Sequence, residues 1–248
     1  MKKIVMFVLV LLLSGCVSME DFGDRSLIGD LVEAESVLWV GPHCDDEIWA
    51  SGFLALSSLG YGKKTYVVCL KDEPGAFPEG ADKEDRFEDN ADYAEFLGLE
   101  EYYMWHMNDY TGTERYVELE NFLDEYISLR EIDMFITFEN THGASGNTDH
   151  TKFSEWFTDY CDRKDLKLYY VLNLDPLLPG YSDGEIDPEP YTDVIDLHSE
   201  FVNNVSLWDM KYGVIEIYST SVPGAKNIYE DEELIENLIP KEFYRIVN

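Results

Sequence analysis

The residues best suited to chemistry lie in two short polar segments about one hundred residues apart. The first is His43-Cys44-Asp45-Asp46-Glu47, which follows an apolar run, and the second extends from Glu139 to His150. These two segments contain three of the five histidines of the chain. Imidazole and carboxylate groups are ligands that zinc and similar divalent metals prefer in proteins. The two segments therefore indicate a metal site.

Within the first segment, His43 and Asp46 are three residues apart across an expected turn from strand to helix, so their side chains can converge on one point. Asp45 would point elsewhere and could approach a metal-held water without being a ligand. Glu47 would open the helix, where exposed N–H groups favour a carboxylate. Three acids in a row are more often a helix cap, but His43 directly before them favours the metal interpretation.

The third ligand is expected to be His150. Two histidines and one aspartate leave an open position on zinc, where a bound water reaches a pKa of about 7 and can attack at neutral pH. A nearby carboxylate can take its proton. His150 alone could instead be a surface histidine at a helix start, and His142 could equally be an ordinary loop residue. The same ligand set suits other divalent metals, namely iron, cobalt and manganese.

The elements that must position these residues follow an alternating pattern of apolar strand-like runs and helical segments, which is typical of βαβ units around a parallel sheet. Strands are expected at 36–40, 65–70, 102–105, 133–138 and 168–172, and helices at 47–59, 82–97, 117–129, 150–161 and 199–218. We also expect an edge strand at 194–197, a short strand within 240–247 and a long loop at 175–192.

This pattern predicts an α/β fold with a Rossmann-like, mostly parallel sheet flanked by helices, in one domain over residues 31–248. Open parallel sheets bind ligands beyond the carboxyl ends of their strands. Both polar segments follow expected strands, so the metal site is predicted at that edge of the sheet.

The first 30 residues are expected to lie outside this fold. Lys2 and Lys3 precede an apolar run over 4–13, which is typical of a secretory signal and too short for an ordinary membrane span. Leu13-Ser14-Gly15-Cys16 resembles a bacterial lipobox, which implies cleavage before Cys16 and a lipid on its thiol. A plain signal peptide is the alternative. We predict a signal peptide over 1–15, a tether over 16–30 and an exported, membrane-anchored protein that faces the periplasm or the cell exterior.

Composition limits the partners. The chain has 18 Lys+Arg against 51 Asp+Glu, a net charge of −33, and such a surface repels the phosphates of nucleic acids, which excludes nucleic-acid binding.

With Cys16 assigned to a lipid, Cys44, Cys69 and Cys161 remain, and nothing in their pattern demands a disulfide. No pattern in the sequence indicates an oligomeric state.

The two segments also resemble the motifs of a known family. Pro42-His43-Cys44-Asp45-Asp46-Glu47, followed later by Asn147-Thr148-Asp149-His150, is similar to the early (A/P)-H-x-D-D-E and late H-x-D-H motifs of the LmbE/PIG-L family of zinc-dependent N-acetylglucosaminyl deacetylases. The resemblance extends more weakly over about residues 36–247, through Arg86 with Phe96-Leu97-Gly98, Lys211 with Tyr218-Ser219-Thr220-Ser221, and Glu242-Phe243.

The resemblance implies that His43, Asp46 and His150 bind zinc and that Asp45 is the general base that activates a zinc-bound water. It implies that Asp149 supports the ligands from outside the coordination shell. The implied reaction is hydrolysis of an N-acetyl group on an amino sugar in a GlcNAc-type glycan or glycoconjugate. The implied fold is again a Rossmann-like sheet with the metal at its carboxyl edge.

One position departs from the family pattern. Asn147 stands where the late motif has its first histidine, and an amide can donate a hydrogen bond to an oxyanion but cannot deliver a proton. Three outcomes are open. Asn147 keeps the electrostatic role while Asp45 makes all proton transfers, His142 compensates, or the activity is reduced, changed or lost. In the last case the chain would be a surface glycan-binding lipoprotein.

Two other enzyme classes are disfavoured by missing motifs. The chain has no G-x-S-x-G segment, which a serine hydrolase of the α/β type would need, and no G-x-G-x-x-G segment for a dinucleotide.

Overall fold

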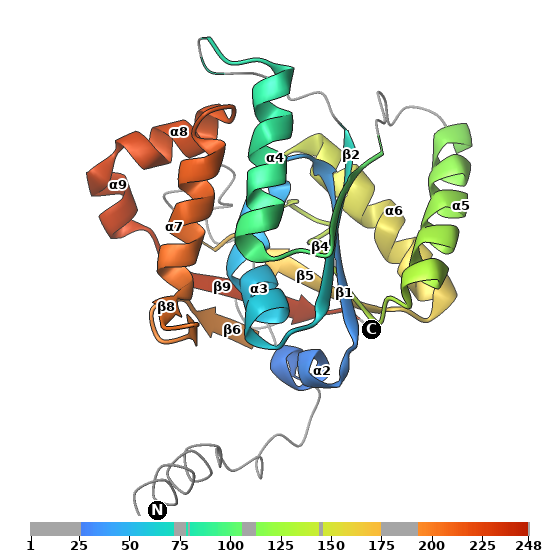
Figure 1. Cartoon of the computed structure of the whole chain (residues 1–248). Helices are drawn as coiled ribbons and strands as arrows, with labels where there is room; N and C mark the ends of the chain where they lie inside the picture. Colours follow the sequence, from blue (N-terminus) through green and yellow to red (C-terminus); the bar gives the residue numbers. More distant parts are fainter. Residues whose placement is uncertain are drawn as a thin grey trace, which may run out of the picture.

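The computed structural model describes residues 26–71, 78, 80–105, 113–143, 146–174 and 193–247 (Figure 1). The predicted signal peptide, Cys16 and the predicted loop at 175–192 lie outside the described residues. Within the described ranges, no helix is both long enough and apolar enough to cross a membrane.

A seven-stranded sheet with the strand order β3-β2-β1-β4-β5-β9-β6 forms the centre of the molecule. Five neighbouring strands are parallel: β1 (Ser36–His43), β2 (Lys64–Lys71), β3 (Glu101–Met104), β4 (Met134–Phe138) and β5 (Lys167–Leu172). Strand β9 (Lys241–Ile246) runs antiparallel to both β5 and the edge strand β6 (Asp193–Asp196). The predicted mostly parallel α/β sheet is confirmed, as is the edge strand.

Helices cover both faces of the sheet because its central strands are apolar on both sides. Side chains alternate along a strand, so Val37 and Trp39 of β1 enter one core while Leu38 and Val40 enter the other. The first core is covered by α3 (Ser51–Ala55), α4 (Lys83–Leu97) and α7 (Leu207–Tyr218), and the second by α5 (Thr113–Arg130) and α6 (Thr148–Lys164) (Figure 1).

Helix α4 is bounded by clear local signals. At its start Asp82 accepts hydrogen bonds from the backbone of Glu84 and Asp85, and the Asp85 side chain accepts one from the Asp82 N–H, which forms a capping box. The helix ends at Gly98 in a left-handed conformation with φ of 63°, and a Cβ there would lie 2.7 Å from Leu59. These signals explain why the predicted and observed bounds of this helix agree closely.

The C-terminal region differs from the prediction. The helix expected over 199–218 begins only at Leu207, because β7 (Phe201–Val202) and β8 (Val205–Ser206) form a hairpin before it. Asn203 and Asn204 make the turn with φ of 52° and 69°, a conformation that asparagine tolerates and that two-residue hairpins favour. Two short helices not predicted from the sequence, α8 (Pro223–Glu230) and α9 (Glu232–Asn237), follow α7.

The N-terminal boundary also needs correction. Helix α2 (Leu27–Glu33) begins inside the stretch predicted as a tether, and Leu27 and Leu31 are buried in the first core. Ser26 caps this helix, and the backbone N–H of Leu27 donates to Asp193 at 2.8 Å. Residues 27–30 are therefore part of the folded domain.

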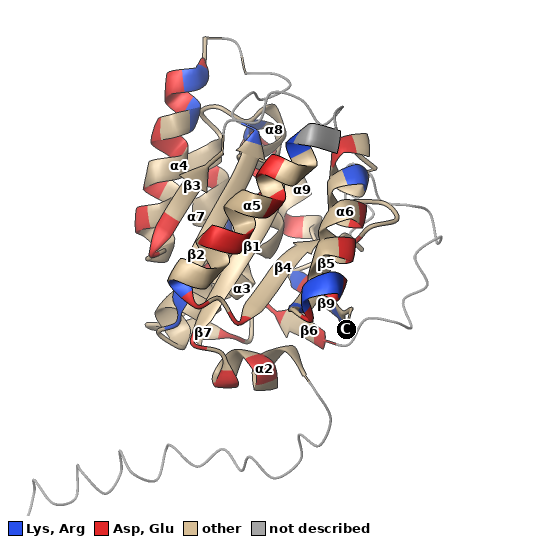
Figure 2. Ribbon diagram, turned by 90° about the vertical axis from the view of Figure 1, so that its right-hand side faces the viewer, with Lys and Arg blue, Asp and Glu red and all other residues tan. Residues whose placement is uncertain are grey.

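Acidic residues are spread over several helices rather than gathered in one (Figure 2). Figure 2 shows them on α2, α4, α5 and α6. This distribution agrees with a solvated acidic surface.

Candidate metal centre

The three residues predicted as metal ligands come together at the carboxyl edge of the sheet. His43 ends β1, Asp46 opens the short 3₁₀ helix η1 (Asp46–Ala50), and His150 lies in the first turn of α6 after the neighbouring strand β4. His43 Nδ1 lies 3.1 Å from His150 Nε2 and 3.3 Å from Asp46 Oδ2, and Asp46 Oδ1 lies 3.1 Å from His150 Nε2. Ligand atoms of a tetrahedral zinc with bonds of about 2.0–2.1 Å are roughly 3.3 Å apart. The two Asp46 distances are to different carboxylate oxygens, and one ligand atom from each of the three residues lies within 4.8 Å of the others, close enough for the three residues to hold one metal ion.

The outer nitrogens of both imidazoles have partners that fix the rings. His150 Nδ1 lies 2.7 Å from the carbonyl oxygen of Gly143, and its ring stacks on Phe138 with centroids 4.4 Å apart. His43 Nε2 lies 3.4 Å from Asp149 Oδ2. When His43 Nε2 and His150 Nδ1 carry the hydrogens, the other nitrogen of each ring, His43 Nδ1 and His150 Nε2, keeps a lone pair that can bind a metal. Two imidazole nitrogens and a carboxylate that converge in this way are a donor set that fits a divalent metal.

The turn before α6 supplies the carbonyl that orients His150. Gly143 has φ of 60°, and a Cβ on it would lie 2.4 Å from the Cβ of His150, so only glycine fits there. The buried Glu139 carboxylate accepts hydrogen bonds from the backbone N–H groups of Thr141, at 2.7 Å, and His142. Glu139 therefore holds this turn, a role that was not predicted from the sequence.

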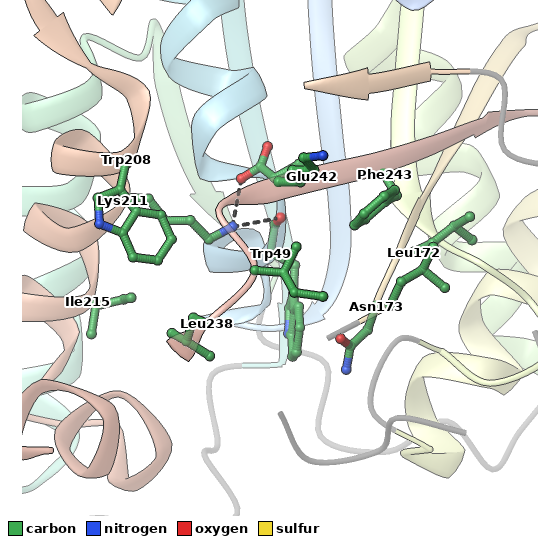
Figure 3. Close-up of a pocket in the computed structure, with 12 residues that line it drawn as sticks. Trp49, Leu172, Asn173, Trp208, Lys211, Ile215, Leu238, Glu242 and Phe243 are labelled. Atoms are coloured by element: carbon green, nitrogen blue, oxygen red, sulfur yellow. Dashed lines mark hydrogen bonds and ion pairs between the residues drawn. The ribbon is translucent and has the colours of Figure 1, made fainter. Parts of the chain in front are cut away.

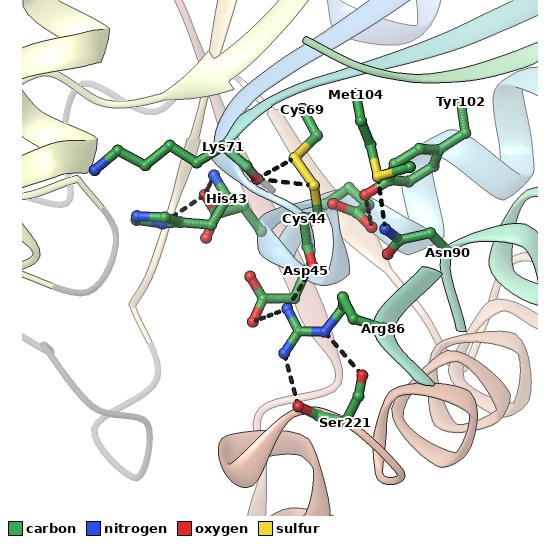
Figure 4. Close-up of a disulfide and its surroundings, with 12 residues drawn as sticks. His43, Cys44, Asp45, Cys69, Lys71, Arg86, Asn90, Tyr102, Met104 and Ser221 are labelled. Carbon is green, nitrogen blue, oxygen red and sulfur yellow. Dashed lines mark hydrogen bonds and ion pairs between the residues drawn. A yellow bond between two sulfur atoms is a disulfide. The ribbon is translucent and has the colours of Figure 1, made fainter. Parts of the chain in front are cut away.

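Asp45 lies beside the ligands but is turned away from them. Its carboxylate points toward the Arg86 guanidinium, with Oδ2 3.3 Å from Nη1 (Figure 4). Burial and the adjacent Asp46 carboxylate raise the pKa of Asp45 above its usual range, while Arg86 opposes this rise. A carboxylate whose pKa is raised accepts a proton more readily than an ordinary aspartate, which suits a general base.

Arg86 fixes both the backbone and the side chain of this segment. It is buried, and its Nη1 donates to the Cys44 carbonyl at 2.6 Å. Its Nε and Nη2 donate to the hydroxyl and carbonyl oxygens of Ser221, both at 2.8 Å (Figure 4). In the sequence, Arg86 and Ser221 are only weak matches to the family pattern. In the structure, Arg86 joins Ser221 to the backbone of Cys44.

Asn147 and His142 lie near the ligands without belonging to the ligand group, which consists of His43, Asp46 and His150. The exposed Asn147 caps α6, and its Oδ1 accepts a hydrogen bond from the Asp149 N–H at 2.9 Å. His142 Nδ1 lies 3.3 Å from Glu139 Oε1. The catalytic roles considered for these two residues stay predictions.

Lys71 is a neighbour of the site that was not predicted from the sequence. It ends β2, and its Nζ lies 2.5 Å from Asp149 Oδ2. Partial burial of Asp149 acts to raise its pKa, but the hydrogen bond and charge of Lys71 outweigh this and hold that pKa below its usual range. Asp149 therefore stays ionised between Lys71 and His43, which agrees with the supporting role that the resemblance implies.

A disulfide joins Cys44 to Cys69 (Figure 4). Cys44 directly precedes Asp45, and Cys69 lies on β2, where it pairs with Gly41 of β1. Among the described cysteines, Cys161 is a free, buried thiol. The bridge was not predicted, because it depends on β1 and β2 being neighbours. It ties the backbone that carries Asp45 and Asp46 to the sheet.

Replacing Cys44 and Cys69 with alanine is expected to lower the free energy of unfolding by about 3–4 kcal/mol, because the bridge closes a loop with a sequence separation of 25. For a domain of this size the Tm should fall by roughly 7–14 °C in thermal unfolding. Thiol titration of the denatured domain starting after Cys16 should find one free thiol before reduction and three after it. An unchanged Tm would show that the bridge adds no stability.

Glu47 is not part of the ligand group, and it is completely buried. Its Oε1 accepts hydrogen bonds from the hydroxyls of Tyr102, at 3.0 Å, and Tyr218, whose hydroxyl also lies 2.9 Å from Asn90 Oδ1. Burial raises the pKa of Glu47 to about 8 from an ordinary value of 4.5, against the lowering effect of the Tyr218 hydrogen bond. The carboxyl group is therefore mostly protonated at neutral pH.

A raised pKa in the folded state means that folding takes up a proton, so the stability from protonated Glu47 is full below pH 4.5 and is lost as pH rises through about 8. Glu47→Gln cannot ionise. Between pH 5.5 and 7.5 the metal-free native protein should lose roughly 1.4 kcal/mol per pH unit relative to this variant in urea unfolding. The exposed Glu216→Gln is the control, and parallel curves for native protein and Glu47→Gln would contradict the assignment.

Comparison with known proteins places this geometry in a family. The model of the PIG-L family, described as GlcNAc-PI de-N-acetylase, matches residues 38–161, which include His43, Asp45, Asp46 and His150. No curated protein matches the chain significantly.

Solved structures show the same fold. N,N'-diacetylchitobiose deacetylase from Pyrococcus horikoshii is 17% identical with a TM-score of 0.61, over 90% of this chain and 87% of that chain. A40926 pseudoaglycone deacetylase is 14% identical with a TM-score of 0.60, and 4-carboxy-2-hydroxymuconate hydratase from Pseudomonas putida is 16% identical with a TM-score of 0.59; each alignment covers 86% of this chain and 96% of the other. With the early motif, the converging ligands and the family match all in agreement, the chain belongs to the PIG-L family.

Proposed function

We propose that this protein is a metal-dependent hydrolase that removes the N-acetyl group from an N-acetylated amino sugar of the GlcNAc type. The observation that carries the proposal is the convergence of His43, Asp46 and His150, whose ligand atoms lie within 4.8 Å of one another, with Asp45 directly before the ligand Asp46. Family membership and two similar structures named as deacetylases support an acetyl amide as the scissile group. A divalent metal held there, zinc in the first instance, would polarise the acetyl carbonyl and lower the pKa of a water that it binds.

The residues around the ligands have separate tasks in this reaction. Asp45 accepts the proton of the attacking water and returns it to the leaving amine. Arg86 holds Asp45 in place through its carboxylate and through the Cys44 carbonyl. Asn147 donates a hydrogen bond from its amide to the oxyanion that forms on the acetyl group. His142 is the alternative residue for this last task.

The test is acetate release from N-acetylglucosamine and N,N'-diacetylchitobiose by the purified domain, with and without a chelator. Acetate formation that stops on chelation and returns with zinc would support the proposal. Acetanilide is the control for an acetyl amide without a sugar. A metal-loaded protein that releases no acetate from either sugar would contradict the proposed activity.

Asn147→Ala and Asn147→Asp should both lower kcat by about 10²-fold, because both remove the amide that donates to the oxyanion. The two variants differ in stability, since aspartate can still cap α6 while alanine costs about 1 kcal/mol. Kinetics and urea unfolding therefore separate the catalytic task from the cap. His142→Ala should leave kcat unchanged; a large fall in that variant with intact activity in the Asn147 variants would assign the task to His142.

A second candidate is a glycan-binding protein without activity, which the asparagine at position 147 favours. Glycan binding without acetate release, in a protein that retains its metal, would support it.

We also propose that the protein is exported and anchored through a lipid on Cys16. The Cys44–Cys69 disulfide supports export, because disulfides persist in oxidising compartments. Mass spectrometry of the N-terminal peptide tests the lipid, with Cys16→Ser as the control. An unmodified Cys16 in a membrane-free protein would contradict the anchor.

A further inference from the structure

Side chains from the last part of the chain contact the backbone just after the metal ligand Asp46. Glu242 on β9 is buried, and its carboxylate accepts four hydrogen bonds. Two come from the backbone N–H groups of Gly52 and Phe53, each at 2.9 Å, one from the Tyr244 hydroxyl at 2.7 Å, and one from Lys211 Nζ at 2.7 Å. Each carboxylate oxygen thus accepts two hydrogen bonds. The two from backbone N–H groups attach Glu242 to the first turn of α3.

Lys211 extends this contact back toward Asp46. It lies on α7, is mostly buried, and donates from Nζ both to Glu242 Oε1 and to the carbonyl oxygen of Trp49, the latter at 3.2 Å (Figure 3). Trp49 belongs to the same 3₁₀ helix that Asp46 opens. Lys211 therefore links β9, α7 and the segment that carries a metal ligand.

The segment from Asp46 to Phe53 needs such outside support. A 3₁₀ helix has poor hydrogen-bond geometry and holds itself weakly. The backbone before Asp46 is held by Arg86 at the Cys44 carbonyl, and the backbone after it by Lys211 at the Trp49 carbonyl. Asp46 lies between these two fixed points.

Gly52 permits the close approach of Glu242. A Cβ on Gly52 would lie 3.1 Å from the carboxyl carbon of Glu242 and 2.5 Å from Leu197. A side chain at position 52 would crowd the carboxylate and clash with Leu197, so the glycine at this position agrees with the contact.

We propose that Glu242 and Lys211 are positioning residues of the metal centre, which set the place of the Asp46 carboxylate relative to His43 and His150. Both act through backbone atoms of the segment that follows Asp46. Both lie outside the part of the chain that the family model matches. The inference rests on the metal-dependent function proposed above, but it concerns metal binding and not the substrate.

The first test is Lys211→Met, which removes the amine and keeps a long side chain. We expect its dissociation constant for Zn²⁺, from competition with a chromophoric chelator, to rise 10- to 100-fold, the usual effect of losing a group that supports metal ligands. The visible absorption of the Co²⁺-loaded variant should change because the Asp46 carboxylate shifts. In kinetics kcat should fall while KM changes little. Lys226→Met is the matched control, since Lys226 lies on α8 and pairs there with Glu230 at 3.9 Å.

A second variant covers the case in which Lys211→Met does not fold, because that change leaves the Glu242 charge buried without its partner. The double variant Lys211→Met/Glu242→Gln has no orphaned charge, and the glutamine oxygen can still accept a backbone hydrogen bond. Weakened Zn²⁺ binding and an altered Co²⁺ spectrum in this folded variant would support the proposal. Native values for both would overturn it.

These measurements need no substrate. A native protein that binds Zn²⁺ and deacetylates nothing would contradict the proposed function alone, and this test would still decide the role of Lys211 and Glu242. A native protein that binds no Zn²⁺ or Co²⁺ would overturn the positioning role as well.

Discussion

Replacing Asp45 with asparagine is expected to lower kcat for acetate release by about 10²- to 10⁴-fold, the range that general-base catalysis contributes. The amide has nearly the same shape but cannot take a proton from the attacking water. Metal content should not change, because the three ligand atoms belong to His43, Asp46 and His150. KM should change little, since the substitution removes proton transfer and not a binding pocket. Steady-state kinetics together with metal analysis of the same preparation measure both effects.

The controls for Asp45→Asn separate three explanations. Asp92→Asn changes an exposed aspartate on α4 and should behave like the native protein. Asp46→Asn should lose both metal and activity. If Asp45→Asn keeps more than a tenth of the native kcat, the base lies elsewhere. If it loses its metal, Asp45 is a ligand and not a base.

The parts of the site that the sequence predicts are those that depend on local geometry. His43 and Asp46 are three residues apart on a strand-to-helix turn, so their convergence follows from the turn alone. His150 could be added because alternating strands and helices predict a parallel sheet, and parallel strands bring their carboxyl ends to one edge. The same reasoning placed Asp45 next to the ligands.

The parts that the sequence did not predict depend on which elements become neighbours. The Cys44–Cys69 disulfide needs β1 beside β2, and the contact of Arg86 with Ser221 needs α4 beside the end of α7. Neither pairing is encoded in residue spacing. The hairpin before α7 is different, because Asn203-Asn204 between short apolar runs is a recognisable turn signal. The predicted helix extended the apolar pattern of α7 from Leu207 back to residue 199, across the residues that form the hairpin.

His150→Ala is expected to abolish metal binding and with it acetate release. His150 provides one of only three protein ligand atoms in the described group, and its ring is already oriented by Gly143 and by stacking on Phe138. Removing the imidazole leaves one imidazole and one carboxylate, too few to compete with water for zinc at ordinary concentrations. Mass spectrometry of the purified domain should find about one metal ion per chain in the native protein and almost none in the variant.

His198→Ala, which removes an exposed histidine beside Trp208, is the control and should keep the metal. Because a metal that binds only the folded state stabilises it, added Zn²⁺ should raise the Tm of the native protein and of His198→Ala but not that of His150→Ala. The Tm comparison also shows that the variant is folded. A folded His150→Ala protein that still holds one ion per chain would mean that the metal binds through another set of ligands. That result would also contradict the assignment of Asp45 as the general base beside this centre.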